Sequence, residues 1–280
     1  MEKIKHITAI QIIEQKGTNS VPFLVLCDDG ELYYAKTMFK SHPPYEDLIN
    51  EILCVYFLDF LEVSVIQPSI IKIPKIVFQS FRNLGLTYDK RYENLDFDNA
   101  YFFGSLVQEN TTEIELYNIT LKDKHDYNKY KNPTDFLKIA TFDYWIGNMD
   151  RRSSNPNILL NQTPEGKFEF LPIDHTQAFA YQNKYKALRL ALMSSLHPKS
   201  IFKTPISKSI INFADSKFIT NFQKTMLSGF LNIVENIEFA FEQVPTDLGL
   251  SIKGKKKIKE ILSDEERNNK VSQIYRNYIK

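Results

Sequence analysis

The stretch YWIGNMDRRSSNPNILL, residues 144–160, places a polar loop directly between two apolar segments. Asp150 and Asn155 lie five positions apart in this loop. Loops held between rigid elements often carry binding and catalytic side chains, because the scaffold on each side positions them. What Asp150 and Asn155 can do therefore depends on the two segments that flank them.

The segment before the loop predicts a buried helix. Asn132 and Pro133 supply an N-cap and a first-turn proline, and the helical pattern runs through Ile146. Its residues are apolar on nearly every face, which is typical of a helix surrounded by protein. Gly147 is expected to end this helix, so that Asp150 follows on a loop attached to a rigid element.

The segment after the loop predicts a β-hairpin. The strand NILL is followed by a Pro-Glu-Gly turn and the strand FEFLPI, after which Asp174 stands. A hairpin brings its two ends together, so Asn155 and Asp174 are expected to share one site. An amide oxygen and a carboxylate suit Mg²⁺, which takes one or two protein ligands together with phosphate oxygens. Asn157 is the weaker ligand candidate, because it is expected on the strand.

The first hundred residues read mainly as strands with one helix. VPFLVLC (21–27) and ELYYAKTM (31–38) flank an Asp-Asp-Gly turn, which is a strong hairpin signal. A helix is expected from Tyr45, after two prolines, and further strands at 68–74 and 100–107.

The remainder of the chain, from residue 176, is mostly helical in pattern. The sequence therefore predicts an α+β fold of two lobes. A β-rich lobe with one main helix spans residues 1–107, and a larger helical lobe spans residues 108–280.

The first lobe offers a cation for phosphate. Lys36 lies inside the strand LYYAKTM, and Glu51 on the following helix is its expected partner. Phosphoryl transfer needs a metal that bridges phosphates, a carboxylate near the nucleophile and a cation on the phosphates. Asp150 fits the carboxylate, and the backbone N–H groups of residues 17–20 can close over the phosphates.

As a set, these motifs resemble the HipA-like kinases of the protein-kinase-like superfamily. The matching pieces are GTNSVPFLV, YYAK, NEILCVYFLDFL, FGS, FDYWIGNMDRRSSNPNILL and PIDHTQAF, between residues 17 and 179. The resemblance implies a bilobal protein-kinase-like fold, ATP as phosphoryl donor and Ser/Thr kinase activity. It implies Asp150 as the catalytic base, Asn155 and Asp174 as Mg²⁺ ligands, and Lys36 as the phosphate-binding lysine with Glu51 as its partner.

The resemblance also implies two segments that contact the nucleotide. The first is the phosphate loop, with Gly17, Thr18, Asn19 and Ser20. The second is the hinge that meets adenine, with Gly104, Ser105 and Val107. Autophosphorylation in related kinases makes Thr18 and Ser20 candidate acceptors.

The sequence departs from the kinase pattern in three places. The phosphate loop has a single glycine, and two arginines, Arg151 and Arg152, follow Asp150, one of them expected near phosphate. His175 replaces Phe-Gly after Asp174, which argues against the usual activation-segment control. No DNA-binding module is visible, and a small antitoxin or regulatory partner is left open.

Composition and short patterns in the sequence limit the expected binding partners and the expected cell compartment. A net charge of +1 gives no basic field for nucleic acid, and no run is long and apolar enough for a membrane. The N-terminus lacks a secretory pattern, which together with Cys27 and Cys54 as expected free thiols indicates the cytoplasm. The expected partner is a protein substrate with a Ser/Thr acceptor.

Other interpretations stay open. His175 also suggests a metal hydrolase, but His6, His42, His125 and His197 lack ligand spacing. The same fold can act on a lipid or small molecule or transfer AMP. A third alternative is a nucleotide-binding interaction module with little catalysis, which the filled catalytic positions disfavour.

Overall fold

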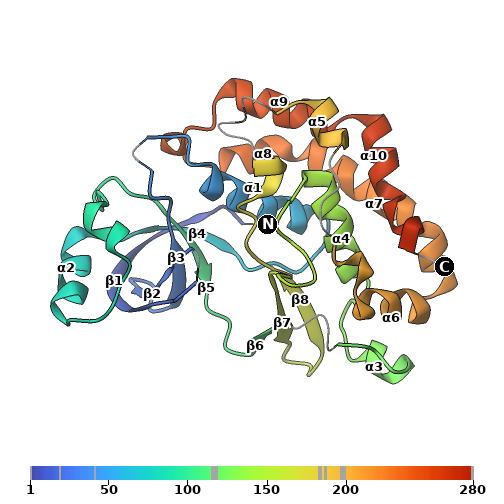
Figure 1. Ribbon diagram of the computed structural model, residues 1–280, viewed down its shortest axis with the longest axis horizontal. Coiled ribbons are helices and arrows are strands. Elements are labelled where there is room, and N and C mark those ends of the chain that lie inside the picture. The colour runs from blue at the N-terminus through green and yellow to red at the C-terminus, as the bar shows by residue number, and fades with distance from the viewer. Residues whose placement is uncertain are drawn as a thin grey trace.

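The computed structural model arranges the chain as a β-barrel beside a helical region, with a small second sheet below (Figure 1). The structure describes all residues except 1, 19, 41, 115–118, 182–184, 186–187, 196–199 and 279–280. Among the described residues, only the side chain of residue 219 is left out.

Five strands close into a barrel in the N-terminal region. They are β1 (Lys5–Gln15), β2 (Phe23–Cys27), β3 (Leu32–Lys36), β4 (Pro68–Lys72) and β5 (Phe102–Leu106). Their order is β1-β2-β3-β5-β4, and β1 closes the barrel by pairing with β4 in parallel. The predicted β2–β3 hairpin is confirmed, and Gly30 takes the left-handed conformation (φ 84°) that its turn requires.

Strand β1 was missing from the sequence-based expectation. Its register against β2 shifts between Ala9 and Gln11 and again between Ile12 and Glu14. Each bulge interrupts the alternation of apolar and polar residues that identifies a strand in sequence. The eleven-residue strand therefore carries no clean period of two.

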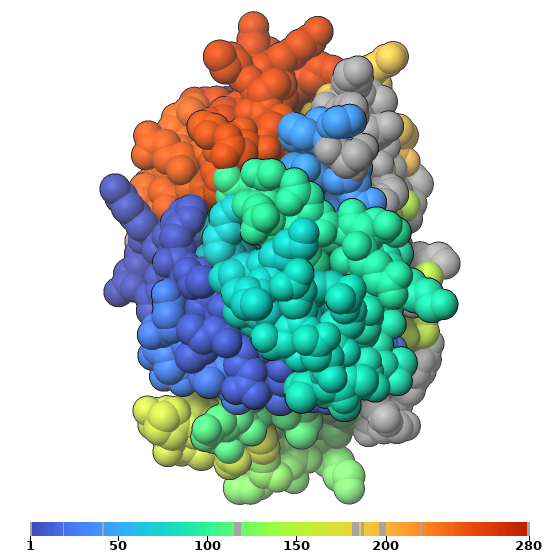
Figure 2. Space-filling view, turned by 90° about the vertical axis from the view of Figure 1, so that its left-hand side faces the viewer, coloured from blue at the N-terminus to red at the C-terminus, as the bar shows by residue number. Residues whose placement is uncertain are grey.

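A second helix covers the barrel, contrary to the expected single helix in this region. α2 (Lys75–Asn83) buries only Phe78 and Phe81, and the short η1 (Lys90–Asn94) adds the buried Tyr92. These aromatic rings pack against Phe23 of β2, at centroid distances of 4.1–6.2 Å. In Figure 2, the teal segment between β4 and β5 lies in the centre of the face, beside the blue strands.

The predicted helix after the two prolines is α1 (Glu46–Phe60), and nearly all of it is buried. Its apolar residues belong to the larger core, which they share with the C-terminal helices and not with the barrel interior. The backbone N–H of Tyr45, just before α1, donates to the carbonyl of Leu248 (2.9 Å). α1 is thus packed into the helical region.

The second sheet contains the predicted hairpin. β7 (Ile158–Gln162) pairs with β8 (Phe168–Pro172), and β6 (Thr111–Glu113), which is too short to recognise in sequence, pairs with β7. The boundary expected at residue 107 falls between β5 and β6.

The buried helix before the polar loop is α4 (Asp135–Ile146), and Gly147 ends it in the left-handed conformation (φ 65°). The expected start at Pro133 is wrong by two residues. Asn132 and Pro133 form a turn in which the Asp135 N–H donates to the Asn132 carbonyl (3.0 Å).

The other helices surround α1 and α4. They are α3 (Lys124–Asn128), α5 (Leu190–Ser195), α6 (Pro205–Phe213), α7 (Ser216–Glu235), α8 (Ile237–Glu242), α9 (Ile252–Leu262) and α10 (Glu265–Ser272), with 3₁₀ segments η2 (Ala178–Tyr181), η4 (Ile201–Lys203), η5 (Thr246–Leu248) and η6 (Ile274–Tyr278). α3 is a short helix in the polar segment before α4. Within the described residues, no helix combines the length and apolarity needed to cross a membrane.

Candidate active site

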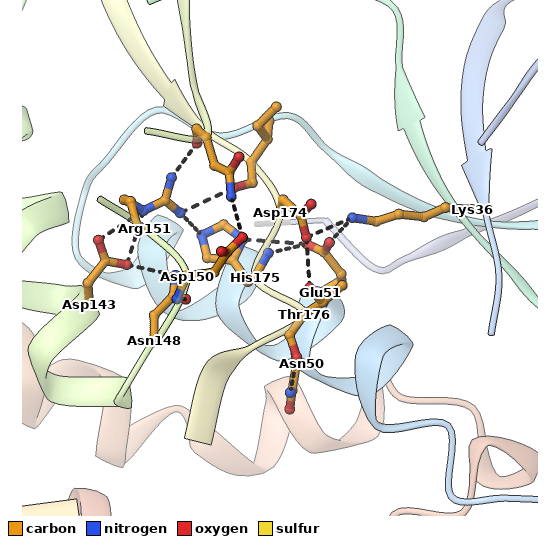
Figure 3. A network of polar contacts seen from close by, with 12 residues as sticks. Lys36, Asn50, Glu51, Asp143, Asn148, Asp150, Arg151, Asp174, His175 and Thr176 are labelled. Carbon is orange, nitrogen blue, oxygen red and sulfur yellow. Dashed lines mark hydrogen bonds and ion pairs between the residues drawn. The ribbon is translucent and has the colours of Figure 1, made fainter. Parts of the chain in front are cut away.

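Lys36 and Glu51 form an ion pair between the barrel and α1. Lys36 ends β3, and its Nζ pairs with Oε1 of Glu51 (Figure 3). Burial by itself would lower the pKa of Lys36, but the carboxylates of Glu51 and Asp174 raise it above its ordinary value. Burial likewise opposes ionisation of Glu51, whereas Lys36 and His175 lower its pKa to about 2. Both groups are therefore charged at neutral pH.

Asp174 joins this pair from the far end of the hairpin. Its Oδ1 lies 3.4 Å from Nζ of Lys36 and accepts a hydrogen bond from the Thr176 hydroxyl (2.9 Å). Its backbone is in the left-handed region (φ 56°), a conformation that costs energy for a residue with a side chain. The fold thus brings together three predicted site residues, Lys36, Glu51 and Asp174.

Asp150 and Asn155 also meet. The Asn155 side-chain amide donates to Oδ2 of Asp150 at 2.8 Å. Their spacing of five is explained by a tight turn in which Arg152 and Asn155 exchange backbone hydrogen bonds of 3.1 and 3.0 Å. The turn folds residue 155 back toward residue 150.

Asn157 was expected on the strand, and this was wrong. It precedes β7 in the left-handed conformation (φ 46°), and its side-chain amide donates to Oδ2 of Asp150 at 3.3 Å. Two amides therefore hold one oxygen of the Asp150 carboxylate. The expected strand began at Asn157, whereas β7 begins one residue later, at Ile158.

Asn155 and Asp174, the expected Mg²⁺ ligands, both have side-chain oxygens that could bind a metal ion. Asn155 donates through its amide nitrogen, so its amide oxygen is available as a ligand, and Asp174 is partly exposed at 31%. The Ile173 N–H donates to the Asn157 carbonyl (2.8 Å), which joins the segment that carries Asn155 to the one that carries Asp174. Within the described residues, no three His, Cys, Asp or Glu side chains form a metal cluster. This donor set fits Mg²⁺, which needs few protein ligands beside phosphate, and not zinc.

Arg151 and Arg152 have different environments. Arg151 is completely buried, and its Nε pairs with Oδ2 of Asp143 on α4 at 2.9 Å. Its other nitrogens donate to backbone carbonyls of Pro156, Asn157 and Ile173. Arg152 is only half-buried, and its Nε has no hydrogen-bond partner within the described residues. Every guanidinium nitrogen of Arg151 is therefore used by the fold, whereas Arg152 keeps an unused donor at Nε among the described residues.

Asp47 is a site residue that sequence reasoning missed. It lies on α1, four residues before Glu51, and its Oδ1 is buried without a hydrogen-bond partner among the described residues. Burial, followed by the charge of Glu46, raises the pKa of Asp47 to about 6, and Lys36 acts in the opposite direction. The one available signal was the helical spacing that places Asp47 on the same face as Glu51.

The expected phosphate loop joins β1 to β2. The Val21 N–H donates to the Thr18 carbonyl (3.0 Å), and the hydroxyls of Thr18 and Ser20 lie 3.4 Å apart. A Cβ added to Gly17 would meet no atom within 4 Å, so nothing in this structure requires glycine there. Asn19 lies outside the described residues.

The expected hinge residues differ in position. Gly104 lies inside β5, where an added Cβ would come within 2.5 Å of the Ile71 side chain, so its glycine serves strand packing. Ser105 is also within β5, paired with Tyr34. Val107 follows the strand, and its N–H donates to the Leu32 carbonyl at 2.9 Å. That N–H is thus used within the barrel. The assignment of Gly104, Ser105 and Val107 to a hinge that contacts adenine stays a prediction.

Similar proteins are found by sequence profile and by fold. The profile of a family described as HipA-like kinase matches residues 7–267. No curated protein is significantly similar in sequence.

Among solved structures, the proinflammatory kinase CtkA of Helicobacter pylori is 14% identical, covering 99% of this chain and 98% of that one with a TM-score of 0.54. This likeness shows a shared bilobal kinase fold. The Golgi casein kinase with Mn/ADP bound covers 97% of this chain and 74% of that one at 14% identity, but its TM-score of 0.39 is too low to compare sites.

Proposed function

The chain belongs to the HipA-like kinase family, and from this membership we propose that it transfers the γ-phosphoryl group of ATP to a serine or threonine hydroxyl of a protein. The single observation that carries this proposal is the meeting of Lys36, Glu51 and Asp174. These residues come from a strand, a helix and the end of a hairpin, and they form one charged cluster.

Each charged group then has a task. Lys36, oriented by Glu51, binds phosphate oxygens. Asn155 and Asp174 would hold Mg²⁺, which when bound offsets the negative charge of the phosphates. Arg152, two residues after Asp150, provides a second cation for the phosphoryl group during its transfer.

Asp150 faces the acceptor. Its Oδ2 is held by Asn155 and Asn157, and the carboxylate takes the proton of the acceptor hydroxyl. The hydroxyl oxygen forms a bond to the γ-phosphorus while the bond from that phosphorus to the β-phosphate oxygen breaks, which releases ADP. The two amide donors orient the Asp150 carboxylate toward the acceptor hydroxyl.

The acceptor is proposed as a protein in the cytoplasm, with a small antitoxin or regulatory protein as a second partner. Two isotope positions separate this proposal from its alternatives. Label from γ-³²P-ATP is expected on protein, and none from α-³²P-ATP. Label from the α position would indicate AMP transfer, and ADP binding without label from either would indicate a binding module.

The Asp150→Asn variant tests the base. We expect a loss of about 10²–10⁴ in transfer rate with nearly unchanged binding of Mg·ADP, because only proton transfer is removed. Asp98→Asn, an exposed change between η1 and β5, is the matched control. Wild-type turnover in Asp150→Asn would remove Asp150 from this role.

A further inference from the structure

His175 has no task in the transfer step, yet it lies between the two halves of the site. It is completely buried, and its backbone N–H donates to Oε2 of Glu51 at 3.1 Å. On its ring, Nδ1 faces the same Oε2 at 3.5 Å, and Nε2 lies 3.0 Å from Nη2 of Arg151. Figure 3 shows the ring between Arg151 on one side and Glu51, followed by Lys36, on the other.

The contacts continue on both sides of the ring. Beyond Arg151, Asp143 accepts from the side-chain amide nitrogen of Asn148 (3.0 Å), and the side-chain amide oxygen Oδ1 of Asn148 accepts from the Asp150 backbone N–H (3.2 Å). Beyond Glu51 stands Lys36. An unbroken series of polar contacts therefore runs from the phosphate-binding lysine to the catalytic aspartate, and His175 is its middle member.

The partners of the ring determine which nitrogen carries the proton. A guanidinium has only donors, so Nε2 must accept from Arg151 and cannot carry hydrogen. A neutral ring then has its proton on Nδ1, which faces the Glu51 carboxylate. This is the tautomer that is less populated in free histidine, so the surrounding residues select it.

We propose that His175 is a positioning residue, a neutral imidazole protonated on Nδ1 that joins Glu51 to Arg151 and so holds Lys36 and the Asp150 loop in one fixed arrangement. Its effect on turnover rests on the proposed function, but its tautomer and its effect on nucleotide affinity do not. Partners of this kind, one contact removed from the ligand-binding groups, typically change affinity or rate by 10–100-fold when mutated.

Two substitutions separate the contact of Nε2 with Arg151 from the contact of Nδ1 with Glu51. His175→Gln keeps an acceptor near the position of Nε2 and loses the ring N–H that faces Glu51, while its backbone N–H still donates to Oε2. His175→Asn keeps an amide N–H near the position of Nδ1 and loses the acceptor for Arg151. His125→Gln, at an exposed position on α3, is the matched control.

The two variants should separate binding from turnover. For His175→Gln we expect Mg·ADP affinity, measured by calorimetry, to fall about tenfold, with kcat nearly unchanged. For His175→Asn we expect kcat to fall about tenfold with affinity retained. Equal changes of affinity and kcat in both variants, or a lower melting temperature with neither changed, would show that His175 only fills the core.

The tautomer provides a test that needs no catalysis. Long-range ¹H–¹⁵N spectra of the protein, assigned by loss of one of five histidine signals in His175→Gln, report which ring nitrogen carries hydrogen. A protonated Nδ1 and a bare Nε2 are expected, and hydrogen on Nε2 would overturn the proposal. If the wild type transferred no phosphate but gave the expected spectrum and affinities, the proposed function would fail and the role of His175 would stand.

Discussion

The two sides of the site are held by different kinds of contact. On the barrel side, Lys36 is positioned by side-chain carboxylates, those of Glu51 and Asp174. On the loop side, Arg151 donates to backbone carbonyls at both ends of the hairpin and pairs with Asp143. Charge therefore determines the geometry of the first side, and a framework of buried hydrogen bonds determines that of the second. Substitutions on the barrel side should therefore change stability in a charge-dependent way, whereas substitutions on the loop side should disrupt a buried hydrogen-bond framework.

The largest expected effect is on the loop side. Arg151→Met leaves the Asp143 carboxylate buried without its cation and removes the guanidinium donors to the Pro156 and Ile173 carbonyls. Breaking a buried pair in this way costs about 3–5 kcal/mol of the free energy of unfolding, which urea titration measures. Arg82→Met, at an exposed position on α2, is the control. Equal stability of the two variants would contradict the idea that Arg151 organises the loop.

A smaller effect is expected on the barrel side, and it should depend on charge. The pKa of Glu51 in the folded protein is about 2, below the ordinary value of 4.5, so its ionisation stabilises the fold above pH 4.5 and this stabilisation is lost as pH falls toward 2. Lys36→Met removes the main charge that lowers this pKa. We expect a loss of about 2–3 kcal/mol at pH 7, measured by urea titration.

A second substitution checks that charge is the cause. In Lys36→Met with Glu51→Leu, the buried carboxylate of the pair is gone and Asp174 is partly exposed to solvent, so most of the stability should return while phosphate transfer stays lost. If the double variant is no more stable than Lys36→Met, packing and not charge holds the barrel side.

The smallest expected effect comes from Asp47, next to the barrel-side pair. Its pKa of about 6 lies above the ordinary 3.8, so the folded state disfavours the ionised carboxylate and loses stability as pH rises from 4 through 6. Asp47→Asn should be more stable than wild type by about 1–2 kcal/mol at pH 7, a value reduced for partial solvent screening. The difference should vanish near pH 4. A constant difference between pH 4 and pH 7 would show that the carboxylate is not the source.

Sequence alone predicted the class of the fold and the hairpin beside the polar loop, whereas several single elements and contacts were missed. The hairpin could be recognised from its turn and apolar strands, so Asp150, Asn155 and Asp174 were assigned to one region by spacing. Arg151 could not be distinguished from Arg152, because burial of a guanidinium depends on carbonyls that only the folded hairpin aligns. The contact between Asn157 and Asp150 was missed because a single left-handed residue carries no periodic signal.

The elements β1 and α2 were missed because their sequences carry too little local signal. β1 is interrupted by bulges and so lacks a clean alternation, and α2 is short and buries only two phenylalanines in nine residues. Both become ordered through packing against distant strands, which is a tertiary effect that propensity does not contain.

The packing of α1 has a mechanical consequence. Glu51 belongs to a helix whose core is shared with the helical region, whereas Lys36 belongs to a strand of the barrel. Ile70 and Phe103 of the barrel strands also belong to that core, so apolar contacts and the ion pair hold the same junction. A fluorescence reporter placed across the pair would therefore record any movement of the barrel against the helical region.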